Sequence, residues 1–496
     1  MYTSSLIQDR RHFLQRCGGI LAGSWFAPGL LRAAGESGME PIRGFGPASG
    51  TVPRVRVAFV RRRGEYGMRW PGQIYDGKAA LTMYREKILR AGVHLNLDIQ
   101  MRETPIYSAG EADHWTAQCS SESCDGLLVV LLDRQEHAWP TAARAADTGL
   151  PTVIFSPLGS SFTTNTHTFA RRTGTLVCST DDFDQVVSGL NMIRAGTRLA
   201  RTRFLVLMGE ESYDSRIETV GVQLRYRPAS DFIELYNRIP VDSRVERLAD
   251  ELMAAAEEIH GPTKTDVCNG IKSLLVAREL LQREACDGIT MDCLGALGPT
   301  DISLPCIAWS AMNDRGVPAA CEADLGACVT QAIVQYLFNA PGFQQDPVAE
   351  TSVAGLIGSH CSCPTRLRGF DHPPEPYTLV PHHGCRDATA RPRWTVGERI
   401  TVADVVLGES VYGTVRRYPA EEGPAAKVSM IISSGEVLDN KSVPPSGGCV
   451  VAPLVKLDDV GRILDYPGFH QLIFYGDHKE ELRRFCQLYR IEARVV

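Results

Sequence analysis

The 496-residue sequence lacks three features that define large classes of protein. Its 52 Lys and Arg residues are outnumbered by 58 Asp and Glu residues, and the net charge of −6 provides no basic footprint for nucleic acid. Beyond about residue 40, no apolar run is long enough to span a bilayer. Neither a G-x-G-x-x-G pattern nor a P-loop occurs in the predicted α/β regions. These absences argue against a nucleic-acid partner, a transmembrane segment in the mature protein, and a dinucleotide or nucleoside triphosphate cofactor.

Cysteine is abundant, but its distribution does not indicate a disulfide framework. The 15 cysteines are odd in number and irregularly spaced, and several, such as Cys178 and Cys293, lie within apolar runs. Free cysteine behaves as a small buried hydrophobe, so we expect reduced thiols. Cys361 and Cys363 form a Cys-x-Cys beside His360, yet no partner pair stands at the separation that closed zinc sites use. The pattern therefore does not favour a structural zinc site.

The first 40 residues have the pattern of an export signal. Arg10 and Arg11 are followed by Phe13 and Leu14, and then by the weakly hydrophobic stretch 18–31. Twin arginines in this arrangement are typical of the pathway that exports proteins already folded in the cytosol. We therefore expect residues 1–40 to be a twin-arginine signal region and the mature protein to be periplasmic or otherwise exported.

From about residue 52 the sequence alternates between continuous apolar runs and amphipathic stretches. The first such region has expected strands at 55–60, 125–132 and 152–155 and a helix at 75–91. A second region has strands at 204–208 and 287–292 and helices near 229–237, 243–258 and 264–284. Continuous apolar strands separated by helices indicate parallel sheets covered on both faces. We expect two related α/β domains, at 52–200 and 201–350.

The last part of the chain, 351–496, has a different pattern. Prolines and glycines become frequent, and short β-type runs follow at 399–407, 428–432, 449–454 and 472–475, before a helix at 478–489. The predicted fold class is therefore α/β, with two Rossmann-like, doubly wound α/β domains followed by a mostly antiparallel β domain.

Three segments concentrate side chains that bind metals. Glu322 stands in the segment 318–324, which we expect to open a helix running to about residue 337; Asp346 stands in a loop before Pro347; His470 enters the last strand. Each also has a structural interpretation, as a helix-start acid, a turn residue and a structural histidine. Asp324 is expected to point elsewhere and to be structural.

The order of these segments resembles the L-fucose/L-arabinose isomerase superfamily, closer to its fucose isomerase branch, over essentially all of the chain after the signal. Pro318-Ala319-Ala320-Cys321-Glu322 looks like the metal-glutamate motif of that family. Asp346 matches the second acidic ligand, and His470 matches the C-terminal metal histidine. His360, in a His-Cys-x-x-Pro context, matches a histidine near the pocket. One departure is Ala323, where we expect a glycine after the glutamate.

The resemblance implies a metal-dependent aldose–ketose isomerase that acts on a pentose or a 6-deoxyhexose through a cis-enediol intermediate. Glu322 and Asp346 would be the acid/base pair, and with His470 they would hold a divalent metal, with Mn²⁺ favoured over Mg²⁺ or Co²⁺. The resemblance also implies a homo-oligomer, a trimer or a hexamer, in which the first domain helps to close a pocket.

Several further residues are candidates for contact with the sugar. Trp70 would stack on a sugar face and Gln73 would hydrogen-bond its hydroxyls, both from the loop after the first strand. His360 and His383 are the candidates from the C-terminal region. An ordered aromatic loop is the alternative interpretation of the segment around Trp70.

Two other functions remain open from the sequence. Paired α/β domains with a polar cleft also describe exported sugar-binding or sensing proteins, which would keep the isomerase fold without turnover. A related enediol reaction such as epimerisation is the other alternative. The three metal-type residues favour an enzyme, because a binding protein has no need for them.

Overall fold

The computed structural model describes residues 44–64, 67–69, 74–134, 136–382, 387–408, 428–442 and 449–496. The predicted signal region and the candidate sugar-contact residues Trp70, Gln73 and His383 lie outside the described residues. Within the described ranges, no helix combines the length and the apolar character needed to cross a membrane.

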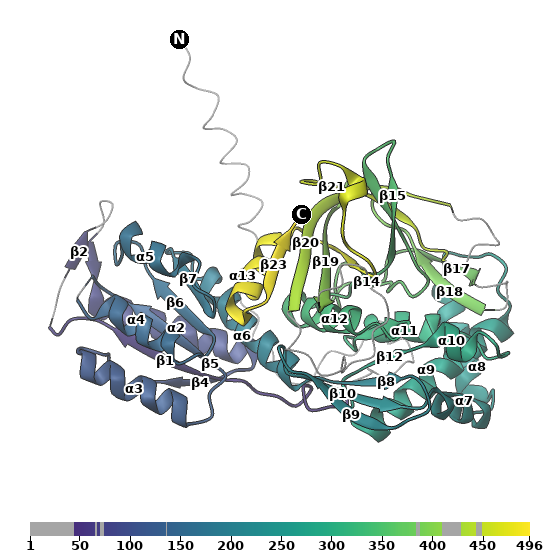
Figure 1. The fold of residues 1–496 in the computed structure, drawn as a ribbon, viewed down its shortest axis with the longest axis horizontal. Coiled ribbons are helices and arrows are strands. Elements are labelled where there is room, and N and C mark those ends of the chain that lie inside the picture. Colours follow the sequence, from purple (N-terminus) through teal and green to yellow (C-terminus); the bar gives the residue numbers. More distant parts are fainter. Residues whose placement is uncertain are drawn as a thin grey trace, which may run out of the picture. The chain divides into compact units, whose positions relative to one another are not determined.

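Five parallel strands form the first sheet (Figure 1). In order across the sheet they are β4 (Asp98–Met101), β1 (Arg54–Val60), β5 (Gly126–Leu131), β6 (Thr152–Ser156) and β7 (Thr175–Ser179). The short hairpin of β2 (Gly67–Arg69) and β3 (Ile74–Asp76) pairs separately. Every residue of β5 is buried, as its continuous apolar sequence predicts.

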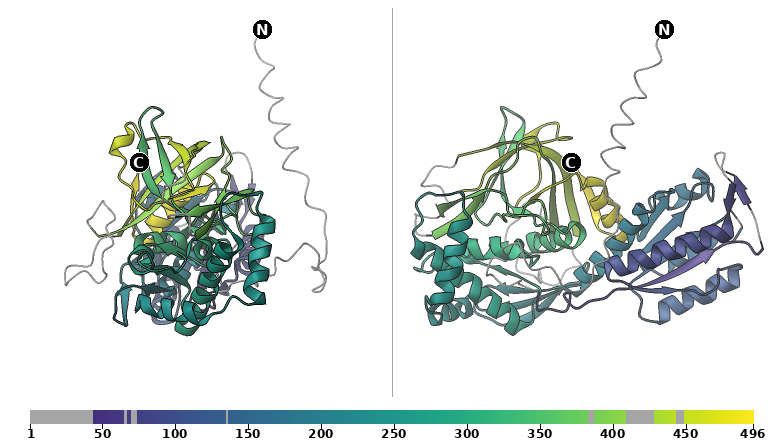
Figure 2. Two further views of the ribbon diagram at one scale, coloured as in Figure 1. Left: turned by 90° about the vertical axis from the view of Figure 1, so that its right-hand side faces the viewer. Right: turned by 180° about the vertical axis from the view of Figure 1, so that it is seen from behind.

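Helices cover both faces of this sheet. They are α2 (Gly77–Leu95), α3 (Ala109–Ser121), α4 (Ala138–Asp147), α5 (Thr163–Ala170) and α6 (Asp184–Arg201). Phe59 of β1 belongs to one apolar cluster with Tyr84 of α2, whereas its neighbour Ala58 belongs to a second cluster with Trp115 of α3. In the view from behind, α2 lies over the near face of the strands (Figure 2). The predicted parallel sheet, covered on both faces, is confirmed.

The second sheet is mixed. Its order is β13 (Ala319–Cys321), β12 (Gly288–Met291), β8 (Arg203–Leu207), β10 (Val222–Arg227) and β9 (Tyr213–Ile217), and only β9 runs antiparallel to its neighbour. The helices of this region are α7 (Ala229–Arg238), α8 (Ser243–Ala255), α9 (Lys264–Glu284), α10 (Cys293–Leu297), α11 (Cys306–Asn313) and α12 (Leu325–Phe338).

The expected helix start at residues 318–324 was wrong. Ala319–Cys321 is a strand, because it pairs in parallel with β12, and α12 begins only at Leu325. Asp324 sets that start, since its carboxylate accepts the N–H of Ala327 at 2.8 Å and so caps the helix. Glu322 therefore lies in the turn between strand and helix, not in the first helical turn.

Helix α12 is apolar and buried on almost all sides. It packs against α6 and against β19 (Arg399–Leu407) of the C-terminal sheet. Asn191 and Arg194 of α6 donate hydrogen bonds to the carbonyls of Leu337 and Tyr336, at 2.9 and 2.8 Å. These bonds satisfy backbone acceptors that the last turn of a helix leaves without partners. Because α12 is held in the interior by this packing, its first residue, Leu325, fixes the position of the preceding turn, which carries Glu322.

The C-terminal sheet is antiparallel except at one pairing and forms a half-barrel (Figure 1). Its order is β14 (Phe343–Gln344), β22 (Leu472–Tyr475), β19, β20 (Val428–Asn440), β21 (Pro453–Leu457), β16 (Gly355–Ser359) and β15 (Asp346–Glu350), and β23 (Glu492–Val495) pairs in parallel with β20. Helix α13 (Lys479–Tyr489) follows β22. The predicted antiparallel C-terminal region is confirmed.

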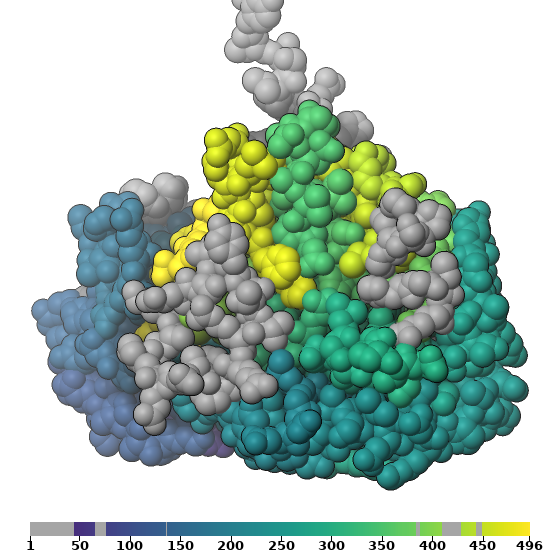
Figure 3. All heavy atoms as spheres, turned by 45° about the vertical axis from the view of Figure 1, so that its right-hand side comes forward, coloured from purple at the N-terminus to yellow at the C-terminus, as the bar shows by residue number. Residues whose placement is uncertain are grey.

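Asp346 does not lie in a loop, as its position before Pro347 suggested. It opens β15 and stands opposite Ser359 of β16. Proline cannot donate to a sheet ladder, but β15 is the last strand in this order, where proline is tolerated. Figure 3 shows the green β15–β16 hairpin at the surface, with yellow C-terminal segments beside it.

A separate three-stranded sheet contains two strands that the proline-rich sequence did not reveal. β17 (Tyr377–His382) pairs antiparallel with β18 (Asp387–Pro392) and parallel with β11 (Glu258–Ile259). His382 is the last residue of β17 and is buried.

A close contact between α6 and α13 gives a first prediction. Tyr489 packs directly on Gly196, and its hydroxyl donates to the carbonyl of Ile193 at 3.2 Å. The methyl group of Gly196→Ala would overlap the Tyr489 ring, and we expect a loss of about 1–3 kcal/mol in the free energy of unfolding. Urea unfolding of the parent and the variant measures this change in the free energy of unfolding. Gly110→Ala in α3 is the control, because nothing lies near that position and alanine favours a helix. Equal stability of the two variants would contradict the contact.

Candidate metal centre

Four side chains of types that bind metals lie close together, each at or next to the end of a strand. Glu322 follows β13, Asp346 opens β15, His360 follows β16, and His470 precedes β22. The pairing of β15 with β16 places Asp346 opposite Ser359, the neighbour of His360. The backbone N–H of Gln345 donates to the carbonyl of Gln471 at 3.0 Å, which brings Asp346 beside His470. The sheet registers therefore assemble the cluster.

The turn that carries Glu322 is held in an unusual backbone conformation. Glu322 has φ of 61° and Ala323 has φ of 54°, both in the left-handed region, which costs about 1–2 kcal/mol per residue outside glycine. Gln344 offsets part of this cost, because its side-chain amide accepts from the N–H of Cys321 at 2.8 Å and donates to its carbonyl at 3.4 Å. His470 also has a positive φ, of 52°. Strained residues of this kind gather at functional sites.

The distances within the cluster fit a common ligand. Nε2 of His470 lies 3.1 Å from Oδ1 of Asp346 and 3.5 Å from Oε2 of Glu322. Nε2 of His360 lies 3.9 Å from Oε1 of Glu322. Adjacent ligands of an octahedral ion, each about 2.1 Å from it, stand about 3.0 Å apart. Glu322, His360 and His470 form a group whose donor atoms lie within 4.8 Å of one another and could hold a metal ion.

Two potential ligand atoms of the cluster are buried and face each other. Oδ1 of Asp346 and Nε2 of His470 are buried and lie 3.1 Å apart; beyond the charge contacts of this cluster, neither has a partner in hydrogen-bond geometry within the described part of the chain. A buried polar atom without such a partner is costly. A divalent cation bound by both atoms would take the place of the Nε2 proton between them, so the donor set fits a metal.

Asp324 orients His470. Nδ1 of His470 lies 2.9 Å from Oδ2 of Asp324, whose other oxygen caps α12. With the Nδ1 proton donated to Asp324, Nε2 is directed at Glu322 and Asp346 as a lone pair. Such a carboxylate–histidine contact is the usual support of a metal-binding imidazole. The expectation that Asp324 points elsewhere and is only structural was therefore wrong, because one of its oxygens contacts His470 while the other caps α12.

The two kinds of donor differ in exposure. The side chains of His360 and His470 are 1% and 3% exposed, whereas those of Glu322 and Asp346 are 30% and 34% exposed. The imidazoles therefore form an inner wall, and the carboxylates stand on the accessible side.

The cluster perturbs its own titration. Burial alone would lower the pKa of His470, but contacts with Asp324, Asp346 and Glu322 outweigh it and raise that pKa to about 12. The contact with His470 lowers the pKa of Glu322. Burial acts to raise the pKa of Asp346, yet His470 and His360 lower it overall. Without a cation, the cluster thus holds an imidazolium among carboxylates.

A buried acid behind the cluster had no signal in the sequence. Asp404 of β19 accepts the N–H of Phe469, the neighbour of His470, at 3.4 Å. Burial, together with the charge of Asp324, raises the pKa of Asp404 to about 7. This carboxyl group therefore changes its protonation near neutral pH.

A second set of candidate ligands lies beside the first. Cys306, Cys361 and His382 form another group with donor atoms within 4.8 Å, and Cys321, His360 and Cys361 form a third. The structure thus contains His, Cys and Glu groupings that could hold a metal ion.

No family model matches the chain, and a search of curated proteins finds no match.

The titration of the cluster predicts how stability depends on pH without metal. His470 stabilises the fold fully below its ordinary pKa of 6.5, and this contribution falls as pH rises towards 12. Glu322 and Asp346 have lowered pKa values, so their ionised carboxylates stabilise the fold at pH values above the ordinary pKa values of 4.5 and 3.8. This stabilisation is lost as the carboxylates become protonated in acid. We expect the contribution of the cluster to be greatest between pH 4.5 and 6.5.

Urea unfolding of the metal-free protein from pH 5 to pH 9 checks this, with His470→Gln beside the parent. The difference between the two should shrink as pH rises above 6.5. His372→Gln is the control, because His372 is exposed and outside the cluster. A difference that grows with pH would refute the charge arrangement.

The contact of Asp324 with His470 gives a further prediction. Asp324→Asn keeps a good helix cap but removes the carboxylate from Nδ1 of His470. We expect Mn²⁺ to bind about 10–100-fold more weakly, measured by calorimetry. Asp242→Asn is the matched control, because Asp242 caps α8 through the N–H groups of Arg244 and Val245. Equal Mn²⁺ affinity in both variants would rule out the orienting role.

Proposed function

We propose that the protein is a metal-dependent aldose–ketose isomerase that acts on a pentose or a 6-deoxyhexose through a cis-enediol intermediate. The observation that carries the proposal is the convergence of Glu322, Asp346 and His470, in which the buried Nε2 of His470 lies 3.1 Å from Oδ1 of Asp346 and 3.5 Å from Oε2 of Glu322. These are the three positions at which the sequence resembles the ligands of the fucose isomerase branch.

The donor set supports a hard divalent ion. Two carboxylates and one imidazole suit Mn²⁺, with Mg²⁺ and Co²⁺ as alternatives. When bound, the ion supplies positive charge beside the sugar oxygens on which negative charge develops. Glu322, Asp346 and His470 would hold it, and Asp324 would keep His470 in the required tautomer.

The chain's own groups would move the proton. Isomerisation transfers a proton between C1 and C2 of the sugar, and a second proton between the adjacent oxygens. The carboxylates of Glu322 and Asp346 stand on the accessible side of the cluster with lowered pKa values, which suits removal of a proton. We assign them as the acid/base pair. His360, whose Nε2 lies 3.9 Å from Oε1 of Glu322, would contact a sugar hydroxyl.

The surrounding architecture is part of the proposal. We infer two Rossmann-like α/β domains ahead of the C-terminal β domain, with boundaries near residues 200 and 350. Trp70, Gln73 and His383 would complete the sugar contacts, and the active form would be a homo-oligomer, either a trimer or a hexamer. Export by the twin-arginine pathway would place the enzyme with sugars outside the cytosol.

The test compares the parent with Glu322→Gln. We expect Mn²⁺ to raise the melting temperature of the parent and not of the variant, and ketose formation from L-fucose, D-arabinose or L-arabinose to fall about 100-fold or more in the variant. Glu350→Gln is the control, because Glu350 lies on the same hairpin as Asp346 and its carboxylate accepts the N–H of Ser352 at 2.9 Å, outside the cluster.

The outcomes separate the alternatives. Failure of Mn²⁺ to bind or to stabilise either protein would reject the isomerase mechanism. Mn²⁺ binding with sugar binding but no ketose would favour the sugar-binding or sensing protein, and an epimer as product would indicate the related enediol reaction.

A further inference from the structure

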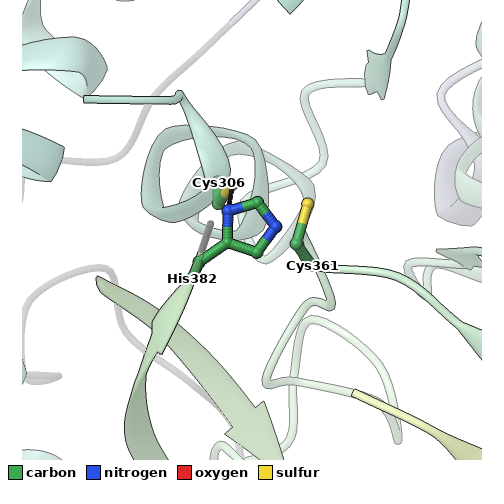
Figure 4. Close-up of side chains that lie close together, drawn as sticks. All are labelled: Cys306, Cys361 and His382. Atoms are coloured by element: carbon green, nitrogen blue, oxygen red, sulfur yellow. Dashed lines mark hydrogen bonds between the residues drawn. The ribbon is translucent and has the colours of Figure 1, made fainter. Parts of the chain in front are cut away.

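Three soft side chains meet in the interior next to the cluster of Glu322 and His470. Cys306 begins α11, Cys361 lies two residues after β16, and His382 ends β17. They are 3%, 7% and 1% exposed, and their donor atoms lie within 4.8 Å of one another. Figure 4 shows the imidazole of His382 with the two cysteine sulfurs beside it.

The spacing of these donors suits a tetrahedral ion. Sγ of Cys306 lies 3.7 Å from Nδ1 of His382. In a zinc site, with sulfur about 2.3 Å and nitrogen about 2.0 Å from the ion, two such ligands stand about 3.5 Å apart. The chain therefore already holds the sulfur and the nitrogen near the separation that a shared ion needs. Three elements distant in the sequence position them, so local backbone geometry does not account for their meeting.

The charge of Cys306, Cys361 and His382 favours a divalent ion. Two thiolates and one neutral imidazole carry a charge of −2, which a divalent ion neutralises. Neutrality matters here, because an uncompensated charge in the interior is costly. Thiolates prefer soft or borderline metals, whereas the carboxylates of Glu322 and Asp346 prefer hard ones. The two clusters thus differ in the metal that they would select.

We propose that Cys306, Cys361 and His382 form a second metal site, which binds Zn²⁺ through two thiolates and one imidazole. On binding, each thiol gives up its proton to solvent and a sulfur–metal bond replaces the S–H bond, with no change of oxidation state. The proposal does not depend on isomerase activity, because it uses none of the three residues assigned to the Mn²⁺ ligands.

The second site is connected to the first through Cys361. Its Sγ lies 3.4 Å from Nδ1 of His360, and Nε2 of His360 faces Glu322. A metal-bound Cys361 thiolate can only accept a hydrogen bond, so Nδ1 of His360 would carry the proton. Nε2 would then present its lone pair towards Glu322. Zinc would thereby fix the tautomer of a residue in the candidate metal centre.

Binding of Co²⁺ to the proposed site can be measured by absorption spectroscopy. The full chain is stripped of metal, kept reduced, and titrated with Co²⁺. We expect a thiolate-to-cobalt charge-transfer band in the near ultraviolet, which Zn²⁺ then removes by displacing cobalt. Cys306→Ser should lose the band, and Cys178→Ser, which changes a buried thiol in a different cluster, should keep it. Circular dichroism verifies that both variants are folded.

Three results with the parent and Cys306→Ser would overturn the proposal: no charge-transfer band in the reduced parent, a band that Zn²⁺ does not remove, or an unchanged band in folded Cys306→Ser. Because the first two use the unmodified chain, a variant that fails to fold leaves the test intact. Glu322→Gln separates the two proposals: it should lose Mn²⁺ stabilisation and retain the cobalt band. Loss of the band in Glu322→Gln would show that the thiols do not form a site of their own.

Discussion

The ion pairs of His470 are the interaction on which the arrangement of the site depends. Asp324 belongs to the turn before α12, Asp346 to the edge strand β15, and His470 to the segment before β22. Without the imidazole, the carboxylates of Glu322, Asp324 and Asp346 would stand close together with no cation between them. Like charges at such distances repel strongly when water is partly excluded. The buried imidazole therefore allows the second sheet and the C-terminal sheet to meet through acidic side chains.

The backbone around this centre is correspondingly constrained. Left-handed conformations at Glu322, Ala323 and His470 are unfavourable by themselves and persist because neighbouring contacts determine them. Gln344 holds Cys321 from one side, and the N–H of Ala323 donates to the carbonyl of Met291 at 2.9 Å from the other. A site built this way is arranged before any ligand arrives, which reduces the cost of ordering it on binding.

The sequence predicted those parts of the fold that continuous patterns determine. The buried strand β5 and the strands β19 and β22 follow from their apolar runs. The start of α12 was misplaced because β13 has only three residues, too few to show a period. Asp346 was assigned to a loop because Pro347 disfavours a strand, and only its place at the sheet edge removes that objection.

Contacts between side chains were harder to predict than helices and strands. The convergence of Glu322, Asp346 and His470 was expected only from family resemblance. The contact of Asp324 with His470 depends on which way a helix-capping carboxylate turns. Cys306, Cys361 and His382 come from separate elements, and only the tertiary packing of α11 with β18, the partner of β17, brings them together.

The burial of the thiols has a consequence for the lifetime of the folded chain. All described cysteines are free, and apart from Cys124 and Cys449 they are buried. Burial raises the pKa of Cys178 and of Cys486 to about 12, so little of either thiol is in the reactive thiolate form. In oxidising surroundings the native chain would resist oxidation, whereas an opened chain would cross-link at random. Unfolding there would be a one-way event, and the height of the unfolding barrier would set how long the protein lasts.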